Sequence, residues 1–131
     1  MIPNPAGSAR DRYRSGAVAT ASPAALVTML FDRAMSAVDR AETLLDDPSA
    51  QAIADAHEEL ARAQDIVSEL QLSLDHERGG EIATGLHGLY DFCLDRLLRA
   101  NLAKDPAPLP EVRHVLTTLR QAWVEAVDGS Q

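Results

Sequence analysis

Apolar residues recur at helical spacing along four stretches of this chain, and short polar or proline-rich segments separate the stretches. Residues 22–46, 50–75, 81–102 and 111–129 each carry apolar side chains at intervals of three and four, which is the period of an amphipathic helix. Three short connections between four helices make sequential helices antiparallel neighbours. The pattern therefore predicts an all-α fold, an antiparallel up-and-down four-helix bundle.

Capping and breaking residues set the expected ends of these helices. Ser22 is placed to cap the first helix, and either Asp47 or Ser49 the second. The pair Gly79–Gly80 can take the left-handed conformation that ends a helix, so we expect it to separate the second helix from the third. Residues 103–110 contain three prolines and predict a stiff turn before the fourth helix.

Residues 1–21 contain two prolines and two glycines and show little apolar periodicity. They are expected to form an irregular N-terminal arm or a short extra helix, followed by one helical bundle domain over residues 22–129. Tyr13 and Val18 are apolar anchors by which the arm could dock on the bundle. A frayed tail is the alternative at this point.

The third stretch has an unusually wide apolar arc. Its main stripe is expected to be core and comprises Ile82, Leu86, Leu89, Cys93 and Leu97. Three further residues extend the arc round one flank, namely Tyr90, Leu94 and Leu98. A helix this apolar either has several neighbours or covers an additional surface. Completion of the core and a groove for a partner segment both remain open here.

Composition narrows the class of protein. The 131 residues support one domain, and only 4% are aromatic, which suits close helix packing better than a sheet. Twelve basic residues against twenty acidic ones leave a net charge of −8, which disfavours nucleic acid or an anionic membrane as partner. No signal peptide and no apolar run of the ~20 residues needed to span a bilayer are visible. We expect a cytoplasmic chain without membrane insertion.

Candidate chemistry is sparse. Glu111 and His114 form the one Glu-x-x-His pair, and their helical positions face away from the expected core. Cys93 is the only cysteine and lies on an apolar face, which indicates a buried hydrophobe in a reducing compartment. No zinc pattern, phosphate-binding loop or nucleophile motif is present. We expect no enzyme, no metal and no cofactor.

Many short stretches nevertheless resemble one family in the right order, from Tyr13 to Val127. They are Tyr13, Val18–Pro23, Leu26, Met29–Asp32, Ala63–Leu70, Ser73–Asp75, Gly79–Ala83, Leu86, Leu89–Phe92, Leu97, Ala100–Asn101, Asp105, Glu111–Val112 and Ala122–Trp123. Together they are similar to the flagellar secretion chaperones that bind flagellin. The resemblance departs at Gly85, where asparagine is usual, and at Arg33, where glycine is common.

The resemblance implies a cytosolic bundle that binds the disordered C-terminal segment of flagellin. Such a chaperone prevents premature polymerisation and supports delivery to the flagellar type III export apparatus, and it could also contact that apparatus or flagellar regulatory proteins. The client is expected to wrap the bundle as helical pieces joined by extended stretches. The expected client-binding residues are Ile66, Leu70, Tyr90, Leu94 and Leu98, covered in the free protein by Tyr13 and Val18 of the arm. The alternative is a bundle that associates with itself or acts as an adaptor for another regulatory protein.

Overall fold

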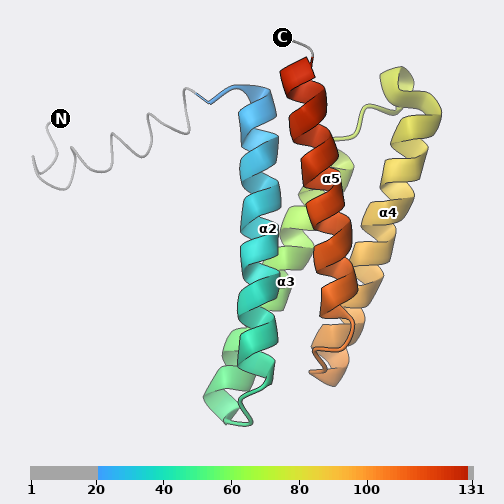
Figure 1. The fold of residues 1–131 in the computed structure, drawn as a ribbon. Helices are drawn as coiled ribbons and strands as arrows, with labels where there is room; N and C mark the ends of the chain where they lie inside the picture. Colours follow the sequence, from blue (N-terminus) through green and yellow to red (C-terminus); the bar gives the residue numbers. More distant parts are fainter. Residues whose placement is uncertain (1–20, 130–131) are drawn as a thin grey trace, which may run out of the picture.

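The structure, a computed structural model, describes residues 21–129 (Figure 1). These residues form four helices, α2 (Pro23–Leu45), α3 (Ala50–Leu72), α4 (His76–Ala103) and α5 (Leu109–Gly129), and no strand. The predicted arm lies almost wholly outside the described residues, and Tyr13 and Val18 are among those outside. The prediction of an all-α four-helix bundle is confirmed.

The helices run up and down in chain order, and each packs against two others. α2 contacts α3 and α5, and α4 also contacts α3 and α5, so that the four helices form a ring around a shared core (Figure 1). On α2 the core side is largely alanine, which allows close approach of the neighbouring helices. The core includes Phe31, Ala34, Ala37, Val38, Leu60, Val67, Leu70, Tyr90, Cys93, Leu97, Leu109, Val112 and Leu116.

Serine and aspartate caps begin three of the helices. The Ser22 hydroxyl accepts a hydrogen bond from the Ala25 N–H at 3.1 Å, and Ser49 accepts one from Ala52 at 3.2 Å. Each bond satisfies one of the amide groups that a helix leaves free at its first turn. The Ser22 cap was predicted and is confirmed, and of the two candidates for the second helix it is Ser49 that forms the cap.

The glycine pair was expected to separate the second helix from the third, and this boundary was wrong, although the expected left-handed conformation is present at Gly80. α3 ends at Leu72 and α4 begins at His76, because the Asp75 carboxylate caps α4 by accepting the Arg78 N–H at 3.0 Å. The glycines therefore lie inside α4, where Gly80 has φ 51° and ψ −123° and kinks the helix. A side chain is strongly disfavoured in that backbone conformation, so glycine is needed at the kink and not at the turn.

Polar contacts tie α5 to α2 along most of their length. Arg113 donates to Asp39 at 2.7 Å and also binds Glu42. Further along, Arg120 donates to Asp32 at 2.6 Å. Beyond it the Trp123 indole N–H donates to a main-chain carbonyl in the first turn of α2 at 3.0 Å. α5 is therefore held against α2 at both ends of the bundle.

Candidate functional site

α4 exposes a large part of its apolar arc. Ile82 is 75% exposed, Leu89 41%, Leu98 47% and Leu102 78%. The expectation that Ile82 and Leu89 belong to the core was therefore wrong. The buried face of α4 is instead formed by Ala83, Tyr90, Cys93, Leu97, Ala100 and Asn101.

Ile82 and Leu89 are exposed because α5 leaves α4 at this end. Arg96 reaches Glu111 of α5 at 3.6 Å, which marks the side of α4 that faces α5. Leu89 precedes Arg96 by seven residues and Ile82 by fourteen, so all three share one side of the helix. Figure 1 shows α4 and α5 close together where α4 ends and separated where α4 begins. The α5-facing side of α4 therefore loses its neighbour over its first turns.

The matching side of α5 is open as well. Val115 is half-buried beside Phe92 of α4, but Ala122, one heptad further along α5, is exposed, and so is Ala126. We call the surface formed by Ile82, Leu86, Leu89, Ala122 and Ala126 the open edge. It is an apolar strip between two diverging helices.

A second apolar line runs along the other side of α4. Leu94, Leu98 and Leu102 follow one another at four-residue spacing; Leu94 is half-buried against the core, while the other two are exposed. Leu98 lies seven residues after Asp91, whose carboxylate accepts a hydrogen bond from Gln71 of α3 at 2.7 Å. This line, which we call the outer stripe, therefore borders α3.

The structure does not bring the five expected client-binding residues into one exposed slot. Ile66, Leu70 and Tyr90 are buried in the bundle. Ile66 lies seven residues after Glu59, which forms an ion pair with a residue of α2, so it faces α2 and not α4. Leu94 and Leu98 are neighbours on the outer stripe and stay candidates for direct contact.

Burial also settles the character of the two titratable groups in this part of α4. Burial raises the pKa of the Tyr90 hydroxyl to about 12, with a smaller contribution from Cys93. Burial raises the pKa of the Cys93 thiol to about 11. Both groups are uncharged at neutral pH, and a thiol held in this state is a poor nucleophile. The prediction of Cys93 as a core residue is confirmed.

Residues 21–129 contain no group of three or more histidine, cysteine or acidic side chains that could hold a metal ion. His114 is exposed, and the Glu111 carboxylate beside it is directed to Arg96. Within the same residues no helix is long and apolar enough to cross a membrane. The exposed apolar surface of α4 is therefore the candidate functional site.

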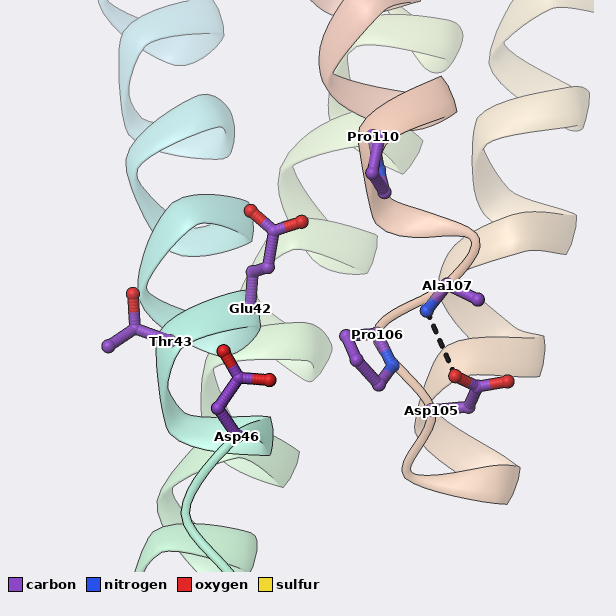
Figure 2. Close-up of a pocket in the computed structure, with 7 residues that line it drawn as sticks. All are labelled: Glu42, Thr43, Asp46, Asp105, Pro106, Ala107 and Pro110. Atoms are coloured by element: carbon purple, nitrogen blue, oxygen red, sulfur yellow. Dashed lines mark hydrogen bonds between the residues drawn. The ribbon is translucent and has the colours of Figure 1, made fainter.

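A cleft of about 400 Å³ lies at the end of the bundle opposite the open edge (Figure 2). Glu42 and Asp46 of α2 line one side, and Asp105 and Pro110 the other. The Asp105 carboxylate accepts the Ala107 N–H at 3.0 Å, and Glu42 binds an arginine of α5. Two of the three acidic side chains thus serve the local structure.

Comparison with known proteins identifies the family. A family model described as Flagellar protein FliS matches residues 6–130. The chain belongs to the FliS family. It is 44% identical to the flagellar secretion chaperone FliS of Salmonella typhimurium, over 82% of this chain and 78% of that one. It is 37% identical to FliS of Escherichia coli K12, over 85% and 80%.

The wider FliS family shows the same relationship at lower identity. FliS of Bacillus subtilis is 29% identical over 91% of this chain and 86% of its own. A crystal structure of a flagellar chaperone from bacteria covers 95% of this chain with a TM-score of 0.74 and 22% identity, which supports the fold. Members of the FliS family are flagellar secretion chaperones and not enzymes. The resemblance inferred from the sequence is thereby confirmed.

Proposed function

We propose that this chain is a cytoplasmic export chaperone for flagellin. It binds the disordered C-terminal segment of flagellin, prevents premature polymerisation and supports delivery to the flagellar type III export apparatus. Membership of the FliS family supports a chaperone with a protein client. The observation that carries the proposal is the exposure of apolar side chains on both sides of α4, along the open edge and the outer stripe.

The exposed side chains are sufficient in number to bind a client of this kind. A disordered segment loses conformational entropy when it binds, so its apolar residues must gain preformed apolar surface. Burying one large aliphatic side chain contributes about 1.5–3 kcal/mol, and Ile82, Leu89, Leu98 and Leu102 are each roughly half to three-quarters exposed. Their burial would contribute on the order of 4–8 kcal/mol, before the cost of ordering the client.

The observed burial divides the predicted contact residues into two groups. Leu94 and Leu98 are proposed to touch the client directly. The buried residues Ile66, Leu70 and Tyr90 are proposed to support client binding indirectly. They fix the positions of α3 and α4 without reaching the surface.

The N-terminal arm is proposed to cover part of this surface in the free chaperone, through Tyr13 and Val18. Support comes from the arrangement of the bundle: α2 begins at the same end at which α4 begins and α5 ends (Figure 1). Residues that precede α2 therefore join the bundle at the same end as the open edge. Deleting residues 1–20 should raise client affinity if the arm competes with the client for this surface.

The test is a calorimetric titration with the C-terminal segment of flagellin from the same organism, with a central flagellin fragment as control. We expect saturable one-to-one binding to the C-terminal segment alone. Leu98→Ser combined with Leu102→Ser should weaken binding at least about tenfold, since two buried contacts are lost. The matched control is Met29→Ser, because Met29 is 40% exposed on α2, away from the open edge and the outer stripe. No binding by folded protein would refute the proposal.

The same exposed residues also favour a second candidate, a bundle that associates with itself or with another regulatory protein. Molar mass measured across a dilution series separates the two functions. A dimer that persists at low concentration and in the presence of the flagellin segment would favour self-association. A monomer that forms a one-to-one complex would favour the chaperone.

A further inference from the structure

We propose that the seam between α2 and α3 binds an acidic amphipathic helix of a partner protein other than the flagellin client. We call this surface the basic strip, and it comprises Leu26, Met29, Arg33, Arg40 and Leu44 of α2 with Arg62 of α3. Three properties of the basic strip support the proposal: its uncompensated charge, its apolar ends and its position in the bundle.

The basic strip holds three arginines that share one acidic partner. Arg33 is exposed, and it is the one arginine of residues 21–129 that forms no ion pair. Arg40 and Arg62 both bind the carboxylate of Glu59, and Arg40 does so at 2.9 Å. The Glu59 side chain is only 14% exposed, whereas those of Arg40 and Arg62 are 57% and 45% exposed. Positive charge therefore faces the solvent along this seam.

The arginines are spaced along α2 and across the seam to α3. Arg33 and Arg40 are seven residues apart, so they share one side of α2 and lie ~10 Å apart along it. The shared contact with Glu59 places Arg62 of α3 beside Arg40. A partner helix that carries two carboxylates seven residues apart would match the spacing of Arg33 and Arg40.

The positive charge is local. Asp55 and Glu69 each lie seven residues from Arg62 on α3, so acidic residues bound the arginines in both directions. Asp39 of α2 is already paired with Arg113 of α5. At ~0.15 M salt, charges are screened over about 8 Å, so a ligand interacts mainly with the charged groups next to it. Carboxylates confined to the middle of a ligand would meet the arginines, whereas a long polyanion such as nucleic acid would also meet the acidic flanks.

Apolar side chains lie at both ends of the basic strip. Leu26 is 38% exposed and Met29 is 40% exposed, and both precede Arg33 on the same side of α2. At the other end Leu44 is half-buried and lines a hollow of about 360 Å³ together with Arg40. The distance from the first to the last of these residues is ~27 Å along α2. An amphipathic helix with apolar residues at both ends and carboxylates between them fits this order.

The basic strip lies across the bundle from the open edge. α2 and α4 each contact α3 and α5, so the seam between α2 and α3 is opposite the seam between α4 and α5 (Figure 1). A partner on the basic strip can therefore bind while the client occupies α4. Residues 1–20 do not fit as the occupant, because their three arginines and one aspartate give them the same sign of charge as the strip.

The first test uses two synthetic helical peptides of equal length with apolar residues at both ends. Between these ends one peptide carries two glutamates seven positions apart, and the other carries two glutamines. With the full chain at ~0.15 M salt, the glutamate peptide should bind about fivefold more tightly, and this preference should shrink at high salt. Equal affinities, or tighter binding of the glutamine peptide, would overturn the inference.

The second test locates the peptide with Arg33→Gln. Arg33 is exposed and unpaired, so the substitution should leave folding intact, lower the affinity for the glutamate peptide about threefold and leave the glutamine peptide unchanged. Arg99→Gln is the matched control, because Arg99 is 68% exposed on α4; it should change neither affinity. A glutamate peptide that binds folded Arg33→Gln as tightly as the unchanged chain would overturn the assignment, and binding through the arginines of residues 1–20 would give that result.

Two further measurements separate other occupants of the basic strip. We expect a single-stranded DNA oligonucleotide not to compete with the glutamate peptide; competition at equal affinity would overturn the choice of an acidic helix. We expect the molar mass across a dilution series to be the same for Arg33→Gln and the unchanged chain. A dimer that Arg33→Gln abolishes would make the occupant a second copy of this chain and would overturn the proposal.

The flagellin segment is finally titrated onto the chain saturated with the glutamate peptide. Its affinity should be unchanged, because the basic strip and the open edge are on opposite sides of the bundle. Displacement of the peptide would show that the client itself occupies the basic strip, which would overturn this inference and leave the proposed function standing. A flagellin segment that does not bind would refute the proposed function and leave the peptide results standing.

Discussion

Two residues of the apolar stripe predicted on α4 should respond to the same substitution with very different losses of stability. Leu97 and Ile82 both belong to that stripe, but Leu97 is fully buried and Ile82 is 75% exposed. Replacing each by alanine therefore tests whether α5 leaves α4 over its first turns. The existence of the open edge depends on the answer.

The expected magnitudes differ several-fold. Truncating a buried leucine to alanine costs about 3 kcal/mol, because the lost transfer free energy is joined by the cost of a cavity. For Ile82 only about a quarter of that effect applies, roughly 0.5–1 kcal/mol, and alanine recovers about 0.4 kcal/mol through its higher helix propensity. We therefore expect Ile82→Ala to change the free energy of unfolding by no more than about 0.5 kcal/mol.

Urea denaturation measures both values. Far-ultraviolet circular dichroism follows the helices, and the fluorescence of Trp123, the only tryptophan in the chain, follows the contact between α5 and α2. Coincident transitions from the two signals would justify a two-state treatment. Leu97→Ala should also lower the midpoint of thermal unfolding by roughly 10 °C, at about 3–4 °C per kcal/mol for a chain of this size.

A loss of about 2 kcal/mol or more in Ile82→Ala would refute the reasoning. It would mean that α4 packs along α5 over its whole length in solution and that no open edge exists. Leu72→Ala serves as the control, because Leu72 is 85% exposed on α3 and its truncation should be close to neutral.

Three further predictions concern the backbone, the charges and pH. Gly80→Ala should destabilise the protein by about 1–3 kcal/mol because Gly80 has a positive φ, whereas Gly85→Ala should stabilise it by about 0.5–1 kcal/mol; thermal unfolding of both variants would show the contrast. Arg113→Met should cost about 1 kcal/mol at low salt and less at high salt, as measured by urea unfolding, because its two ion pairs are partly exposed. The free energy of unfolding should fall as pH rises from about 9 to 12. Tyr90 and Cys93 ionise at their ordinary pKa in the unfolded chain, whereas folding raises the pKa to about 12 for Tyr90 and about 11 for Cys93. Cys93→Ala should therefore make the free energy of unfolding less dependent on pH.

The sequence was sufficient for the helices because their signals are local. Apolar spacing and the serines at 22 and 49 depend only on neighbours in the chain, and both were confirmed. The glycine pair shows the limit of such signals. α4 begins where a side chain accepts hydrogen bonds from the unpaired N–H groups of its first turn, and in the structure that side chain is Asp75. Composition alone does not tell whether the helix starts there or after Gly80.

The sequence indicated that a partner site, if present, would be apolar, but it did not show which residues are exposed. The width of the apolar arc on α4 left two possibilities, completion of the core or a further apolar surface, and the structure exposes part of the arc. The three contact residues chosen on α4 were taken from one flank of the arc, which put Tyr90 among the surface candidates although it is buried. Periodicity defines a face of one helix, but the exposed part of that face depends on where the next helix lies, and this is a property of the packing.

The packing of α5 on α2 includes a charge register between two helices that are far apart in sequence. Asp32 and Asp39 are seven residues apart on α2, and Arg113 and Arg120 are seven apart on α5, so antiparallel helices bring both pairs together at once. These contacts hold α5 to α2 along its length, whereas α5 diverges from α4 towards the first turns of α4, which lose a neighbour. A substitution that weakens this register, such as Arg120→Leu, should therefore let α5 move towards α4 and lower client affinity at the open edge, with little loss of helix content.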